Sequence, residues 1–201
     1  MARDQAGEGL SNAVVFRDPR AVSSRSWVLV TSNVHKWHEA QRILGYAIER
    51  VELDLLEVQA ENVGAIALQK ARDAYARLGR PVIVEDAGFE LVGLGGFPGP
   101  FIKFWEKLGG LESLCRAADG LADRRARAVC ALGICSEHGS DVVEGAVDGL
   151  LALHPRGKNG FGWDAVFVPK GEGRTFGEMT PAEKDAYSHR RRAWERLRDR
   201  L

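Results

Sequence analysis

An aromatic and acidic run near residue 160 has the chemistry of a nucleobase site. Residues 160–164 read Gly-Phe-Gly-Trp-Asp. The rings of Phe161 and Trp163 offer flat faces on which a base can stack. The carboxylate of Asp164 can accept a hydrogen bond from N1–H of a 6-oxo purine, whereas adenine has a lone pair at N1. This run therefore predicts the base end of a purine nucleotide site.

A cationic group follows at Lys184, His189 and Arg190, in a stretch whose pattern predicts a single helix over residues 181–201. Lysine and arginine neutralise phosphate, and arginine can hold an anion with two parallel hydrogen bonds. His189 and Arg190 can also donate to O6 of a purine, where adenine carries an amine. A polar site that mismatches the wrong base discriminates more strongly than an apolar pocket does.

Phosphate-binding chemistry is also expected near the start of the globular part of the chain. The apolar residues 28–31 predict a buried strand, and Asn33 or Ser32 can cap the helix that follows. Thr31 and Asn33 lie at this junction, where backbone N–H groups and the helix dipole favour an anion. Lys36 lies one turn further along the helix, so all three are candidate phosphate ligands.

The acidic pair Glu85 and Asp86 follows a second apolar run, residues 82–84, which predicts a buried strand ending at the pair. A carboxylate there can hold Mg²⁺ and can orient or deprotonate a water molecule. We therefore take Asp86 as the candidate catalytic residue, with Glu85 in a supporting role.

With these groups in place, the chain resembles the inosine triphosphate pyrophosphatase family of house-cleaning enzymes. The resemblance runs from about Trp27 to Arg192. It rests on T-x-N-x-x-K at residues 31–36, E-D at 85–86, G-G-x-P-G-P-x-I-K at 95–103, G-F-G-W-D at 160–164 and S-H-R at 188–190. One such motif alone is a weak signal, but the whole series in order is a strong one.

The resemblance implies a fold, a reaction and partners. The fold is α/β, with a long twisted mixed sheet that divides two lobes and a central nucleotide cleft between them. The reaction is hydrolysis of inosine, deoxyinosine and xanthosine triphosphates (ITP, dITP and XTP) to the monophosphate and pyrophosphate, by attack of a metal-positioned water on the α-phosphorus. The family also implies a homodimer, and apolar residues around 101–114 are a possible part of its interface.

Further site residues follow from the same resemblance. Glu57 matches the metal-binding glutamate and would hold Mg²⁺ together with Asp86. The lysines expected to bind substrate are Lys36, Lys70, Lys103 and Lys184. The sequence departs from the family at Ala87, where relatives often carry Ser or Thr, and at Ala165, where they usually carry Pro.

Two other functions stay open at this stage. One is the same pyrophosphohydrolase chemistry on another or a modified nucleotide. The other is a non-catalytic nucleotide-binding or assembly protein. The complete lysine set together with Asp86 favours an enzyme over the second of these.

Composition narrows the class of protein. The chain has 201 residues, 45% of them hydrophobic, with 28 basic and 28 acidic side chains and a net charge of zero. This balance argues against general affinity for nucleic acid or a membrane surface, and no apolar run approaches membrane-spanning length.

The three cysteines form no metal-type pair and leave one over in any disulfide scheme. We therefore expect buried thiols in a reducing, cytoplasmic compartment, and surface positions for His35 and His38.

The organisation expected along the chain is one catalytic domain, residues 27–201, after a flexible extension, residues 1–26. An edge strand at residues 13–16 is the alternative for part of that extension. Periodicity predicts a helix ending at Gly45, a strand at 48–53, a helix at 63–78 and a loop at 93–100. Two short helices are expected in 101–118, broken at residues 109–110. Antiparallel strands are expected at 127–135, 142–147 and 150–153, with turns at 138–139 and 148–149.

Overall fold

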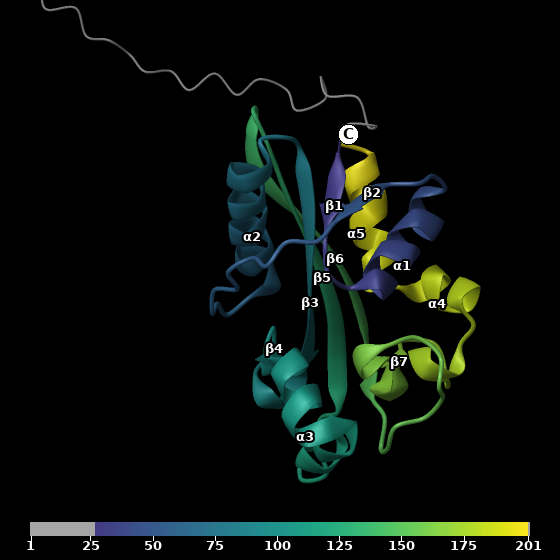
Figure 1. Ribbon diagram of the computed structural model, residues 1–201. Coiled ribbons are helices and arrows are strands. Elements are labelled where there is room, and N and C mark those ends of the chain that lie inside the picture. The colour runs from purple at the N-terminus through teal and green to yellow at the C-terminus, as the bar shows by residue number, and fades with distance from the viewer. Residues whose placement is uncertain (1–26, 201) are drawn as a thin grey trace, which may run out of the picture.

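The computed structural model describes residues 27–200. The expectations for residues 1–26, a flexible extension or an edge strand, lie outside the described residues. The described part forms a seven-stranded mixed sheet with helices on both faces (Figure 1). No helix within this part is long and apolar enough to cross a membrane.

Seven strands and five α-helices make up the fold. The strands are β1 Val28–Val30, β2 Glu49–Val51, β3 Val82–Leu91, β4 Pro98–Gly99, β5 Arg125–Ser136, β6 Gly139–Leu151 and β7 Phe167–Pro169. The helices are α1 Val34–Leu44, α2 Val63–Leu78, α3 Ile102–Ala117, α4 Pro181–Tyr187 and α5 His189–Arg198. Short 3₁₀ turns are η3 Val92–Leu94, η4 Gly162–Val166 and η5 Phe176–Glu178.

The sheet order is β2-β1-β3-β5-β6-β7, with β4 paired to β3 outside this path. Strands β2, β1 and β3 are parallel where they pair, and all the other pairings are antiparallel. The fold is thus α/β with a mixed sheet, as expected.

Successive side chains of β1 and β3 point to opposite faces of the sheet, and each face packs against different helices. Leu29 and Ile83 point into a core with Trp194 of α5 and Leu44 of α1. Val28, Val30, Val82 and Val84 point the other way, into a core with Ala71 and Ala74 of α2. Successive side chains of a strand face opposite sides, so both faces are apolar and both carry helices.

A third core, called here the lower core, forms where β3, β5 and β6 extend past the α2 and α5 layers. Phe89 near the end of β3 packs there with Trp163 of η4 and Phe167 of β7, and Leu114 of α3 belongs to the same cluster. Figure 1 shows these long strands running from an upper part, with α2 on one side and α1 and α5 on the other, down to a lower group that contains α3, β4 and β7. The expected two lobes along one long sheet are therefore present.

Several elements match the sequence expectations closely. Helix α1 begins after Asn33, its cap, and ends at Gly45 in the left-handed conformation. Helix α2 has the predicted bounds. Helix α3 is broken where expected, because Gly110 has φ 74° and ψ 164° inside an otherwise continuous helix.

Four expectations about elements were wrong. The segment 93–100 is not entirely loop, because it contains the end of η3 and strand β4, which pairs with the end of β3. Strand β3 does not end at residue 84 but continues to Leu91, because β5 pairs with it along its whole length. The segments 142–147 and 150–153 are parts of one strand, β6, with no turn at 148–149, because β5 and then β7 pair with it there. The cationic segment is two helices, not one, because Ser188 ends α4 and caps α5. Lys184 is therefore on a different helix from His189 and Arg190.

Candidate functional site

A cleft of about 680 Å³ lies between the two lobes. Its walls come from the β1–α1 turn, α2, the middle of β3, the start of α3, η4 and the start of α5. Every site residue predicted from the sequence lines this cleft except Lys184, which lines a neighbouring pocket of about 150 Å³. Phe161 and His35 line both, so they stand between the two spaces.

The β1–α1 turn is held in shape by its own side chains. Asn33 Oδ1 accepts hydrogen bonds from the backbone amides of His35, at 2.9 Å, and Lys36, at 3.2 Å. The Asn33 amide donates to Thr31 Oγ1 at 3.1 Å. Asn33 thus acts as a helix cap, and two of the amides that might have met an anion are already bonded. Phosphate binding by Thr31 and Asn33 stays a prediction.

Two carboxylates and two lysines meet in the middle of the cleft. Lys70 Nζ lies 3.0 Å from Glu57 Oε2 and 3.0 Å from Asp86 Oδ2. Lys103 Nζ lies 3.4 Å from the same Glu57 oxygen. Burial alone would lower the pKa of Lys70, but the Asp86 and Glu57 carboxylates outweigh it and raise that pKa. Burial likewise works against ionisation of Glu57, yet Lys70 and Lys103 lower its pKa.

These carboxylates fit a hard divalent cation. Within residues 27–200 no three His, Cys, Asp or Glu side chains gather as a complete protein metal site. Mg²⁺ is commonly held by only one or two carboxylates, together with water and substrate phosphates. Glu57 and Asp86 supply those two carboxylates on the wall of a nucleotide-sized cleft, so the residues present fit Mg²⁺.

Asp86 reaches the cleft from the middle of a strand. Strand β1 pairs with β3 only as far as Val84, so the following residues of β3 lie just beyond the end of the parallel neighbour. In open α/β sheets this edge, at the carboxyl end of parallel strands, is where ligands bind. Asp86 Oδ1 also accepts a hydrogen bond from the Ala87 amide at 2.9 Å. The backbone amide therefore fixes Asp86 Oδ1, and Asp86 Oδ2 points toward Lys70.

At the base end, Phe161 lies between an imidazole and two cations. Its ring stacks on His35, with centroids 5.2 Å apart and planes inclined by 20°. Lys184 Nζ lies 4.8 Å and the Arg190 guanidinium carbon 5.2 Å from its centroid. Trp163 is only 8% exposed and packs edge-on against Phe89 in the lower core. Phe161 is therefore the more exposed ring of the pair, although His35, Lys184 and Arg190 surround it.

Asp164 is buried and tied to the protein through one oxygen. Its Oδ2 accepts a hydrogen bond from the Phe161 amide at 2.8 Å and pairs with Lys184 Nζ at 2.6 Å. Burial raises the pKa of Asp164, and Lys184 opposes that rise. Both of these hydrogen bonds use Oδ2, so Oδ1 accepts none from the described residues.

Arg190 is the centre of a buried ion-pair network. Its guanidinium donates to both oxygens of Glu85, at 2.8–3.0 Å, and to Glu39. Glu39 also accepts from Lys184 Nζ at 2.8 Å. Burial would raise the pKa of Glu39, but Arg190 and Lys184 lower it to about 2. Arg190 is thus held rigidly at the cleft wall, with part of its hydrogen-bonding capacity already used.

His189 is an uncommitted polar group in the same wall. It is 1% exposed, and neither ring nitrogen has a hydrogen-bond partner among residues 27–200. Its ring lies 5.1 Å from that of Trp163. Burial, followed by the nearby charges of Arg190 and Lys184, lowers its pKa well below the usual range. His189 is therefore a buried imidazole, favoured in its neutral form, in the wall of the cleft.

Sequence reasoning missed three residues of this site. Glu39 holds the two buried cations, His35 stacks on Phe161, and Glu106 of α3 lines the cleft close to Gly162. Burial and the nearby Asp164 carboxylate raise the pKa of Glu106. Glu39 had one available signal: it lies three residues after Lys36 on α1, and residues at that spacing share a helix face.

Comparison with known proteins decides the family. The sequence model of the Ham1 family matches residues 27–200, which is the whole described part of the chain. The chain belongs to the Ham1 family. Relatives in this family bear the names that the sequence motifs led us to expect, so the resemblance is confirmed.

Two relatives illustrate the similarity in sequence. A dITP/XTP pyrophosphatase of Hyperthermus butylicus is 39% identical over 175 residues, which cover 86% of this chain and 92% of that protein. Inosine triphosphate pyrophosphatase 2 of Trypanosoma cruzi is 41% identical over 180 residues, which cover 87% of this chain and 91% of that protein.

Two solved structures show the same fold. A HAM1 protein from Coxiella burnetii superposes with a TM-score of 0.76 at 28% identity, covering 85% of this chain and 95% of that one. A nucleoside-triphosphatase, dITP/XTP pyrophosphatase, from Mycobacterium abscessus gives a TM-score of 0.69 at 32% identity, covering 85% and 98%. The Ham1 fold thus spans nearly the full length of these chains.

Proposed function

We propose that this Ham1 protein hydrolyses the non-canonical purine nucleoside triphosphates ITP, dITP and XTP to the monophosphate and pyrophosphate. The observation that best supports this proposal is that one cleft is lined both by the Lys70, Glu57 and Asp86 cluster and by Phe161 and Asp164. Cations and carboxylates suit a triphosphate, and an aromatic face with a buried acceptor suits a 6-oxo purine. The names of the relatives agree with this substrate class.

In the proposed reaction, water attacks the α-phosphorus. A bond forms from the water oxygen to that phosphorus as the bond to the α–β bridging oxygen breaks, and pyrophosphate leaves. Asp86 takes the proton from the water. Lys36, Lys70, Lys103 and Thr31 with Asn33 position the phosphates, so most of the rate enhancement comes from orientation and fixed charge.

Mg²⁺ is the cofactor we propose, held by Glu57 and Asp86. When bound, it would neutralise phosphate charge that the lysines leave unbalanced. Asp86 then has two proposed roles, as metal ligand and as base. Its Oδ1, fixed by the Ala87 amide, and its Oδ2, directed to Lys70, are the two oxygens available for them.

Base selection belongs to the other end of the cleft. Asp164 Oδ1 is proposed to accept from N1–H of the base. The neutral His189 and a remaining N–H of Arg190 are proposed to donate to O6. Lys184 acts mainly through Asp164 and Glu39, because it pairs with both from outside the main cleft. Adenine presents the opposite pattern at both positions.

The wider setting forms part of the proposal. The catalytic unit is residues 27–201 and acts as a homodimer, and the exposed apolar residues Phe104 and Leu108 on α3 support an interface there. A monomeric mass at micromolar concentration would reject the dimer.

A cytoplasmic location is supported by three free, buried cysteines, which suit a reducing compartment.

Replacing Asp86 tests the chemistry directly. We expect Asp86→Asn to fold normally and to lose turnover of ITP by at least about 10²-fold, because the base and a metal ligand are removed together. Pyrophosphate release should be measured alongside monophosphate formation. Asp73→Asn is the matched control and should keep wild-type turnover, because Asp73 pairs with Arg77 on α2 and does not line the cleft. A loss of only a few-fold in Asp86→Asn would remove this residue from the mechanism.

A further inference from the structure

We propose that the Lys70 ammonium occupies the space between Glu57 and Asp86 in the free protein and must leave before a divalent cation can enter. The inference rests on the proposed function, which makes these two carboxylates the metal ligands. It adds that metal and triphosphate bind in a coupled manner, because the phosphates take up the ammonium that the metal displaces.

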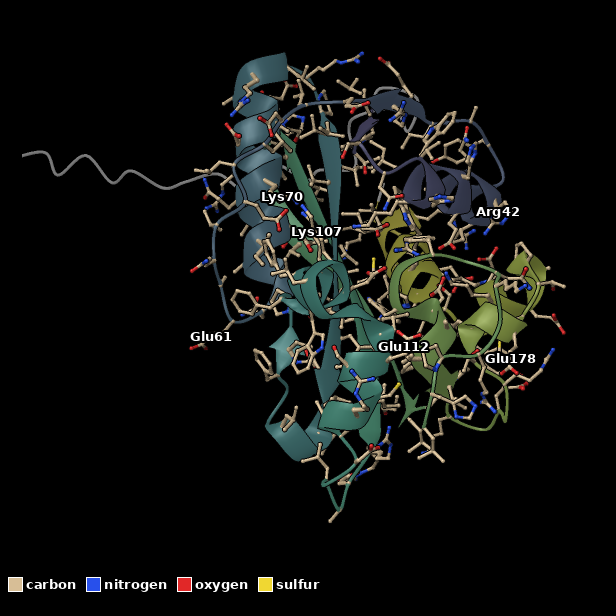
Figure 2. All side chains as sticks on the ribbon, turned by 60° about the horizontal axis from the view of Figure 1, so that its bottom comes forward. Arg42, Glu61, Lys70, Lys107, Glu112 and Glu178 are labelled. Carbon is tan, nitrogen blue, oxygen red and sulfur yellow. The ribbon has the colours of Figure 1, made fainter. Side chains whose placement is uncertain are left out.

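The geometry around Lys70 carries this proposal. Its Nζ is 3.0 Å from Glu57 Oε2 and 3.0 Å from Asp86 Oδ2, so one ammonium bridges one oxygen of each carboxylate. The three side chains are between 14% and 32% exposed, so water screens these contacts only in part. Lys70 projects from α2, on which Figure 2 labels it. The carboxylates come from other elements: Asp86 lies in β3, and Glu57 lies between β2 and α2.

A divalent cation bound to these oxygens is incompatible with Lys70 in place. Each carboxylate has several lone pairs, so the conflict is one of position and charge: a divalent cation shared by Glu57 and Asp86 would lie where the ammonium lies, and positive charges so close in a partly buried site repel strongly. Metal entry therefore breaks both Lys70 ion pairs. The flexible lysine stem allows the ammonium to swing into the cleft, where it needs a new anion.

A triphosphate in the cleft supplies that anion. Once phosphate oxygens hold Lys70, the loss of its ion pairs is offset and the two carboxylates are free for the metal. By linkage, whatever the nucleotide contributes to metal affinity, the metal contributes equally to nucleotide affinity. Free protein then holds metal weakly, which keeps the carboxylates paired when no substrate is present.

Lys103 provides a matched control in the same cluster. It carries the same charge and also approaches Glu57 Oε2, but at 3.4 Å, and its side chain is 67% exposed. It has no ion pair with Asp86 among the described residues. Removing Lys103 tests the general effect of deleting a positive charge near the site, whereas removing Lys70 also vacates the position between the carboxylates.

The test is Mn²⁺ binding without nucleotide, followed by the electron paramagnetic resonance signal of free Mn²⁺. We expect Lys70→Met to bind Mn²⁺ at least about tenfold more tightly than wild type, and Lys103→Met to differ from wild type by less than about threefold. Lys70→Gln should behave like Lys70→Met. Affinity in Lys70→Met that equals or falls below that of wild type overturns the proposal, and so does an equal gain in Lys103→Met.

Two further measurements keep the result interpretable. Mn²⁺ should raise the melting temperature of Lys70→Met more than that of wild type, since a ligand of the folded state stabilises it. Adding Asp86→Asn to Lys70→Met should abolish the gain in affinity, and a gain that persists would place the metal elsewhere and overturn the inference. Pyrophosphate release by the wild-type protein is measured separately, so failure of the proposed function is distinguishable from failure of this coupling.

Discussion

At the scale of single residues, the site is built on a buried network of opposite charges. Glu39 and Glu85 hold Arg190, and Glu39 and Asp164 hold Lys184. Removing one partner from such a pair leaves an uncompensated charge in a place with little water. The network therefore fixes the side chains that face the base, and it makes the fold depend on them.

Glu39 is the residue on which this dependence is easiest to measure. We expect Glu39→Gln to lower the free energy of unfolding at pH 7 by about 3 kcal/mol, because it leaves Lys184 and Arg190 underpaired. Urea denaturation measures the change. Glu49→Gln, which removes an exposed partner of Arg80, should change stability little. Equal stability of Glu39→Gln and wild type would show that the network is not important for the fold.

The pH dependence of the same pair of proteins gives a second check. The pKa of Glu39 falls from 4.5 to about 2 on folding. A lowered pKa in the folded state means that ionised Glu39 stabilises the protein above pH 4.5, and that this contribution is lost as the pH falls toward 2. Stability of wild type should therefore fall more steeply than that of Glu39→Gln across this range. Parallel curves would contradict the assignment.

Which of these residues the sequence reveals depends on the range of the interaction. Phe161, Asp164, His189 and Arg190 lie in short motifs, and the structure brings all of them to one cleft. Glu39 lies in no such motif, and its role depends on contacts with residues about 150 positions away. The sequence also does not show that Trp163 is more buried than Phe161, because Trp163 packs against Phe89 in the lower core, which forms from distant segments.

At the scale of elements, local signals predicted the helices better than the strands. Caps and glycines fixed the ends of α1 and α2, since these signals lie within the helix and its neighbours. The lengths of β3 and β6 depend on pairing with β5, which no local pattern records. The break between α4 and α5 was missed because Ser188 was not recognised as a cap within a continuous charged segment.

Close approach of helices to the sheet is another property of the elements. A side-chain carbon on Gly133 of β5 would overlap the Ala67 carbonyl of α2. We expect Gly133→Ala to destabilise the protein by about 1–3 kcal/mol, because the backbone of α2 must shift. Gly120→Ala is the control, since a side-chain carbon there meets no atom within 4 Å, and its effect should stay within about 0.5 kcal/mol. Equal melting curves for the two variants would contradict this packing.

At the scale of the whole molecule, the long central strands β3, β5 and β6 run through both lobes, and the cleft lies between the lobes. The lining elements meet closely: Phe161 stacks on His35 of α1, and Lys36 of α1 lies 3.5 Å from Glu85, which also pairs with Arg190 of α5. Because these elements belong to one sheet scaffold, the fold sets the distances between the proposed phosphate ligands and the proposed base ligands. Under the proposed function, reaction at the α-phosphorus then depends on which base contacts Asp164 and His189.

The central claim, that Asp164 and His189 read a 6-oxo purine, is tested most directly by kcat/KM of the wild-type protein for ITP, XTP and adenosine triphosphate in one pyrophosphate-release assay. We predict that ITP and XTP exceed adenosine triphosphate by at least ~10²-fold, a difference of roughly 2.7 kcal/mol in transition-state binding, because Asp164 and His189 match N1–H and O6. Comparable kcat/KM values for ITP and adenosine triphosphate would contradict the account.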